Sequence, residues 1–110
     1  MSWIDEVEKE LIRAREAVKL GNEGRVRVSA RRAVSVAVHE LQKKDTGKNY
    51  RGDAVHQLQD IARDVTFPPE VRNAANRLQA RLSTDFTSES KDPIADALII
   101  IECIRLKLSE

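Results

Sequence analysis

The sequence is poor in aromatic residues, which make up only 4% of its 110 positions. A sheet is therefore disfavoured, because strands pack largely through aromatic and β-branched side chains. Hydrophobic residues make up 41% and charged residues 34%, which excludes the apolar-poor composition of disordered chains. The core must be built from alanine, valine, leucine and isoleucine, which favours closely packed helices. The length supports one domain spanning residues 1–110.

The chain also has little cysteine and no long hydrophobic run. Cys103 is the single cysteine, so no disulfide can form within the chain, and no cysteine and histidine spacing suggests zinc. The longest strongly apolar run, LIII, is far shorter than a membrane span. Glycine-rich phosphate loops are absent as well. We therefore expect a cytoplasmic protein without a metal, a cofactor or a membrane partner.

Two helices are predicted at the start of the chain, separated by a turn at LGNEG. Ser2 and Asp5 have the spacing of a capping box. Apolar residues then recur every three or four positions, at Ile4, Val7, Leu11, Ala14 and Val18. Gly21 suits the left-handed position after a helix, and Asn22 suits the cap of the next one.

The stretch from Asn22 to Leu41, NEGRVRVSARRAVSVAVHEL, begins with the alternation of a half-buried strand. The alternation fails beyond Ser29. At 100° per residue, one helical stripe collects Val26, Ala30, Ala33, Val34, Ala37 and Leu41. The stretch is therefore predicted to be a helix, and its alanines predict close approach of a neighbouring helix.

Three further helices are predicted from caps and apolar stripes. Asp53 can cap a helix with its stripe at Ala54, Leu58, Ile61, Ala62 and Val65. Pro69 can begin another, with its stripe at Val71, Ala75, Leu78 and Leu82. Asp92 and Pro93 begin the last one. The predicted fold is all-α: a single-domain bundle of about five largely antiparallel helices.

The last helix differs from the others because apolar residues surround most of its circumference. The candidates for the core or for an oligomer interface are Ile94, Leu98, Ile101, Ile104 and Leu108. Such a helix is either central in its own bundle or shared with a partner, and a homodimer is the expected form of sharing.

Positive charge is concentrated in the second helix and the loop after it. Net charge is +1 overall, but residues 13–52 hold eleven basic and four acidic side chains. Arg25, Arg27, Arg31 and Arg32 are therefore candidates for contact with a phosphate backbone, and Tyr50 could stack on a base. Solvated surface charge, paired in part with the acidic first and third helices, is the alternative interpretation.

Both histidines follow arginines at short spacing, in RGDAVH at Arg51 and His56 and in RAVSVAVH at Arg32 and His39. Together with the helical pair AREAVKLGNEGRVRVSARRAV, this resembles the HEPN group of small helical bundles. That resemblance implies a ribonuclease site in which His56 acts as acid or base and Arg51 stabilises phosphate charge.

A second resemblance covers residues 57–108. The segments LQDIARDVTFPPEVRNAANRLQARL and KDPIADALIIIECI look like the core of a small uncharacterised prokaryotic family of helical bundles. It implies a fold and no activity. The sequence thus favours a bundle that acts by association, as a homodimer or with a protein or RNA partner, and without an evident catalytic site. The alternative is a HEPN-like, metal-independent ribonuclease or RNA-binding protein.

Overall fold

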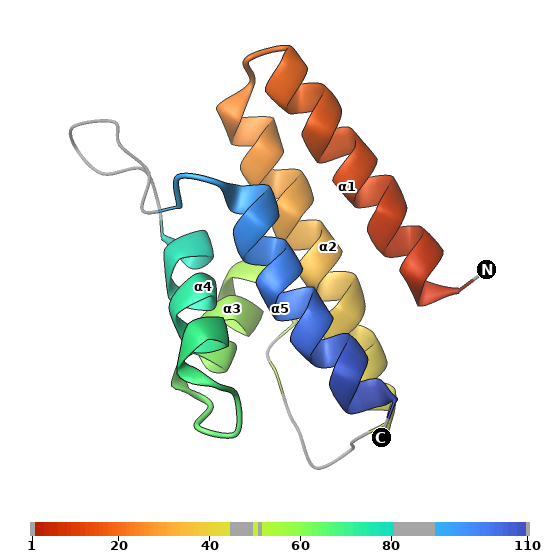
Figure 1. Ribbon diagram of the computed structural model, residues 1–110, viewed down its shortest axis with the longest axis vertical. Helices are drawn as coiled ribbons and strands as arrows, with labels where there is room; N and C mark the ends of the chain where they lie inside the picture. The colour runs from red at the N-terminus through yellow and green to blue at the C-terminus, as the bar shows by residue number, and fades with distance from the viewer. Residues whose placement is uncertain (1, 45–49, 51, 81–89, 110) are drawn as a thin grey trace.

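The computed structural model describes residues 2–44, 50, 52–80 and 90–109 (Figure 1). Within these ranges all regular structure is helical, which confirms the predicted all-α bundle. Its five helices are α1 (Trp3–Lys19), α2 (Glu23–Lys44), α3 (Ala54–Arg63), α4 (Pro69–Gln79) and α5 (Pro93–Leu108). The stretch that begins like a strand, from Asn22 onward, is helical from Glu23, as its periodicity predicts.

The predicted caps explain where the helices begin. Ser2 Oγ accepts a hydrogen bond from the backbone N–H of Asp5 at 3.3 Å, and Asn22 Oδ1 accepts one from Arg25 at 3.1 Å. Asp92 does the same for Ala95 at 3.1 Å. These bonds satisfy amides that have no partner within the first turn of a helix.

Helix α2 lies at the centre and packs against the other four helices (Figure 1). Helix α1 packs almost entirely on α2, and the two are antiparallel, as expected of neighbours joined by a short turn. Helix α5 instead runs parallel to α2. Their C-terminal ends meet where Lys44 Nζ donates to the carbonyls of Lys107 and Leu108, each at 3.0 Å.

The core is aliphatic with one buried phenylalanine. Its largest fully buried apolar side chains are Phe67, Leu58, Ile61, Leu78, Ile100, Ile104, Val34 and Val38. The alanines predicted to allow close approach of a helix, Ala30, Ala33 and Ala37, are completely buried. Tyr50 joins this core and donates from Oη to Asp64 Oδ2 at 3.0 Å, so its ring is not available to stack on a base.

Some residues of the predicted apolar stripes lie outside the core. Ile4, Val18 and Val65 are exposed. Val65 follows the end of α3 at Arg63, so the helical period no longer fixes its direction. Leu82, at the end of the fourth stripe, lies outside the described residues. Within the part of the chain that the structure describes, no helix is both long and apolar enough to span a membrane.

Candidate functional site

His56 lies in the first turn of α3, where Asp53 holds it at two points. Asp53 Oδ1 accepts from the backbone N–H of His56 at 2.9 Å, and Oδ2 contacts ring atom Nδ1. The His56 side chain is otherwise exposed. Its predicted catalytic partner, Arg51, lies outside the described residues. Asp53 thus caps the helix, as predicted, and it also orients the imidazole.

The second histidine, His39, follows Arg32 by seven positions on α2. Both side chains are exposed, and His39 Nε2 lies 3.5 Å from Nε2 of Gln57. Gln57 is fully buried and also donates to the carbonyl of Gly52 at 3.2 Å. The neighbour of His39 is therefore an amide, which supplies no charge for a phosphate.

The four arginines of α2 do not form one exposed surface. Arg25 and Arg32 are exposed. Arg31 is half-buried and donates from Nε to the Leu78 carbonyl at 2.8 Å and from Nη2 to the Ala80 carbonyl at 3.1 Å. Arg27 is buried. Only two of the four candidates therefore face solvent as a phosphate contact requires.

Arg31 has a structural role instead. The carbonyls of Leu78 and Ala80 belong to the C-terminal end of α4, where backbone acceptors lack partners within the helix. The Arg31 guanidinium donates hydrogen bonds to two of these carbonyls. Its positive charge also interacts favourably with the negative end of the helix dipole. Arg31 thus fastens α4 to the central helix.

A buried carboxylate joins α4 to α5. Asp96 is 6% exposed and accepts from Arg77 Nη2 at 2.7 Å and from Arg77 Nε at 3.3 Å. Ser90 Oγ donates to it at 2.6 Å. The hydrogen bond to Asp96 raises the pKa of the Arg77 guanidinium above its ordinary value. Sequence reasoning missed this group, because an aspartate in the first turn of a helix reads as a response to the helix dipole.

A cavity of about 710 Å³ opens between the turn that joins α1 to α2 and the start of α5. Because α2 and α5 are parallel, the N-terminal ends of both helices border it. Its lining residues are Val18, Gly21, Asn22, Glu23, Val26, Arg27, Ser90, Lys91, Asp92 and Pro93. Its volume is in the range of small-molecule sites.

The burial of Arg27 is a second feature, after the Asp96 and Arg77 pair, that the sequence analysis did not predict. A signal was present: Arg27 precedes Ala30, Val34 and Val38 at spacings of three, four and four, which all lie on one buried side of α2. Because Ala30, Val34 and Val38 form a buried stripe, an arginine at position 27 on the same side of the helix is buried as well.

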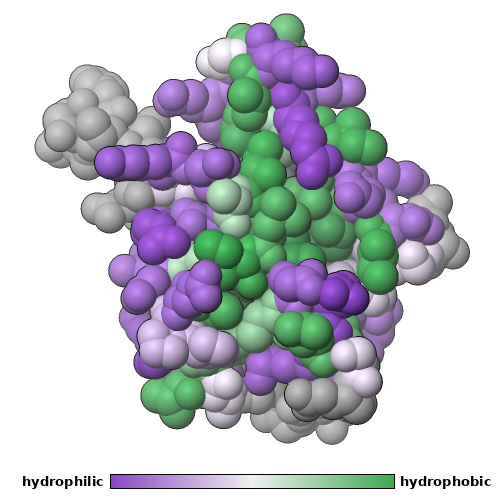
Figure 2. All heavy atoms as spheres, in the orientation of Figure 1, coloured by the Kyte–Doolittle hydropathy of each residue, from purple (hydrophilic) through white to green (hydrophobic). Residues whose placement is uncertain are grey.

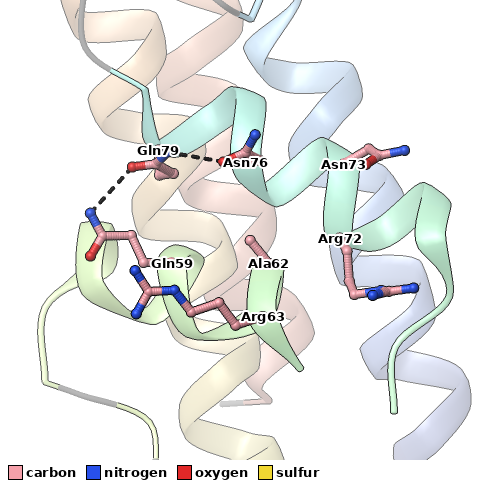
Figure 3. Close-up of a pocket in the computed structure, with 7 residues that line it drawn as sticks. All are labelled: Gln59, Ala62, Arg63, Arg72, Asn73, Asn76 and Gln79. Carbon is pink, nitrogen blue, oxygen red and sulfur yellow. Dashed lines mark hydrogen bonds between the residues drawn. The ribbon is translucent and has the colours of Figure 1, made fainter. Parts of the chain in front are cut away.

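A second, smaller pocket of about 360 Å³ lies between α3 and α4 (Figure 3). Arg63 and Arg72 both line it, but Figure 3 shows their guanidinium groups pointing away from each other. Gln59 donates to Gln79 and Gln79 to Asn76, each at 3.3 Å, so the amides bond among themselves. The charges of this pocket do not converge on one point.

The residues of α5 proposed for the core or an interface differ in their burial. Ile101 and Ile104 are buried, Ile94 and Leu108 are half-buried, and Leu98 is exposed. Asp96 and Lys107 mark the side of α5 that meets α4 and the Phe67 loop, since Lys107 Nζ lies 4.8 Å from the Phe67 ring centre. Leu98 is about 160° or more around the helix from both, at 100° per residue.

The side of the molecule on which α1 and α5 flank α2 carries an apolar band (Figure 2). Helix α1 exposes Ile4 and Ile12, and α5 exposes Leu98 beside half-buried Ile94. Glu8 and Arg15 lie along the same side of α1, because the positions 4, 8, 12 and 15 follow a helical period. We call these six residues the association face.

The chain matches no family model, no curated protein and no solved structure. The resemblances to HEPN bundles and to the uncharacterised prokaryotic family therefore stay predictions.

Proposed function

We propose that this protein acts by association and forms a homodimer through the association face. The observation that supports this proposal is the exposure of large aliphatic side chains there. Ile4, Ile12 and Leu98 are 48%, 50% and 41% exposed. Other aliphatic residues are exposed too, outside the association face: Val18, Leu20, Val28, Val65 and Leu106. Covering exposed apolar surface of this kind with another protein lowers the free energy of the system.

A second copy of the chain is the partner that the charges of α1 favour. The first half of α1 contains Asp5, Glu6, Glu8, Lys9 and Glu10, whereas the second half contains Arg13, Arg15, Glu16 and Lys19. One half is therefore acidic and the other basic. An antiparallel twofold pairing of two α1 helices places each acidic half against a basic one.

The residues on the association face have the register that such a twofold pairing needs. Glu8 and Arg15 lie three and four positions from Leu11, the middle residue of α1. In an antiparallel pair, Glu8 of one copy can therefore meet Arg15 of the other, with Ile12 near the twofold axis. Within one chain they form only a loose ion pair, with Arg15 Nη1 3.7 Å from Glu8 Oε2 and both side chains about half exposed. Both groups are thus accessible to a partner.

The test is the mass of the full-length protein in solution, measured by light scattering or sedimentation from micromolar to millimolar concentration. The wild-type protein should be dimeric. Ile12→Asp and Leu98→Asp should each weaken the dimer by about 100-fold or more, because a twofold interface buries each new carboxylate twice. Circular dichroism should be unchanged, since both positions are exposed in the monomer.

Val65→Asp is the matched control, because Val65 is 81% exposed and lies outside the association face. It should leave the mass unchanged. Glu8→Arg and Arg15→Glu should each weaken the dimer, and the double exchange should restore it. A monomeric wild-type protein over the whole concentration range, or a dimer indifferent to Ile12 and Leu98, would refute the proposal.

The alternative, a HEPN-like ribonuclease or RNA-binding protein, gains less support from the described residues. His56 has an orienting carboxylate but no described arginine partner, and only Arg25 and Arg32 of the four basic candidates are exposed. Loss of RNA cleavage in His56→Ala, with the fold retained, would favour the alternative over the proposed function.

A further inference from the structure

Arg27 is a buried cation that no group in the described part of the protein neutralises. Its residue is 7% exposed, and its Nε is buried without a hydrogen-bond partner. Charged side chains are rarely buried unless they are paired, because the loss of hydration is then uncompensated. Arg27 is one of the residues that line the cavity between the starts of α2 and α5, so this cavity is the space from which an anion can approach its side chain.

The carboxylates near this cavity either hydrogen bond to groups other than Arg27 or lie exposed to solvent. Asp92 Oδ1 accepts from the backbone N–H of Ala95 at 3.1 Å. Asp96, which the cavity residue Ser90 contacts, also holds both bonds from Arg77. Glu23 is exposed in the first turn of α2. None of these side chains is hydrogen bonded to Arg27.

The helix ends add to the positive potential that Arg27 creates. The N-termini of α2 and α5 both border the cavity, and the free amides and dipoles at such ends favour negative charge. Lys91 lies at the same site. The buried arginine and the starts of two parallel helices thus border one cavity.

The rest of the lining distinguishes between kinds of anion. Val18, Val26 and Pro93 provide apolar wall, which suits the hydrocarbon part of an organic ligand. Glu23 and Asp92 balance Lys91 and Arg27 in formal charge, which disfavours a doubly charged phosphate. A carboxylate matches the planar guanidinium with two parallel hydrogen bonds.

From these observations we infer that the cavity between the α1–α2 turn and α5 binds a small organic monocarboxylate, with Arg27 pairing to its carboxylate group. Val18, Val26 and Pro93 contact the apolar part of the ligand. This site is separate from the association face and does not depend on dimer formation.

The inference is tested by NMR titration of the ¹⁵N-labelled full-length protein with sodium butyrate, and with inorganic phosphate and chloride at equal ionic strength. Butyrate should shift the amides of Gly21 and Gly24 and the Nε–H of Arg27 to saturation. Arg27→Met should weaken this binding by about 10- to 100-fold, the usual effect of losing hydrogen bonds to a charged group.

Arg25→Met is the matched control, because Arg25 is an exposed arginine two positions away on the same helix. It should bind butyrate as the wild-type protein does. Arg27→Met should keep its fold and melting temperature or raise the latter, because an apolar side chain of similar length replaces an unpaired buried charge.

Several results would overturn the inference. They are the absence of saturable shifts with butyrate, retained binding in Arg27→Met, and equal loss of binding in Arg25→Met. Tighter binding of phosphate than of butyrate would overturn the assignment to a monocarboxylate. A large fall in the melting temperature of Arg27→Met would show that the guanidinium is satisfied within the protein, and would also contradict it.

Discussion

The carboxylate of Asp96 should be among the most important polar groups for the stability of this bundle. It is buried in the first turn of α5 and accepts three hydrogen bonds, two from Arg77 and one from Ser90. Replacing it with alanine removes the acceptor for all three while leaving helix propensity high. The change therefore isolates the tie between α4 and α5.

The loss of stability expected for Asp96→Ala has two parts. Ser90 is 2% exposed, so its hydroxyl loses its acceptor in a buried place, at about 1–3 kcal/mol. The Arg77 side chain is 41% exposed and can turn to water, which reduces the loss of its charge-assisted bonds to about 1 kcal/mol. Asp96→Ala should therefore lower the free energy of unfolding by about 2–4 kcal/mol, a large share of the 5–15 typical of a domain.

Urea denaturation followed by circular dichroism at a fixed protein concentration measures this free energy, since a dimer would make it concentration-dependent. A double-mutant cycle with Arg77→Met should give a coupling of about 1–2 kcal/mol between the two residues. Glu102→Ala is the control on the same helix, because Glu102 pairs with Arg105 on the exposed surface and should leave the midpoint unchanged. A cost below about 1 kcal/mol for Asp96→Ala would refute the reasoning from burial.

Two further changes test the turn beside the cavity and the single thiol. Gly21 has a φ of 70° with open space around it, so Gly21→Ala should cost about 1–2 kcal/mol from backbone strain alone. Gly24→Ala, in the first turn of α2, should instead stabilise the protein by up to about 1 kcal/mol. A change in unfolding free energy of the same sign for both variants, measured by urea denaturation, would contradict this contrast. Burial raises the pKa of the Cys103 thiol, so its alkylation at neutral pH, followed by mass spectrometry, should be slower than in the urea-unfolded chain and should accelerate as pH rises. Equal rates in the two states would show that burial does not protect it.

Most of the fold could be predicted from the sequence because helices are specified by neighbours in the chain. Asp53 and Asp92 mark two helix starts, and the left-handed Gly21 follows α1 as its position after the first stripe predicts. Each of these signals involves residues within one or two turns of each other. The place of His56 beside Asp53 was predictable for the same reason, since only three positions separate them.

The sequence alone determined the helices and their apolar stripes, whereas only the tertiary structure decided which polar groups are buried and what they meet. Arg25 and Arg27 are two positions apart in the same basic segment, yet one is exposed and the other lines a cavity. Arg77 and Asp96 pair across 19 positions because α4 packs on α5. The parallel course of α2 and α5 brings two helix starts to one cavity. The physical reason is that caps and periodicity act within a few residues, while the burial of a charge depends on which helices pack around it.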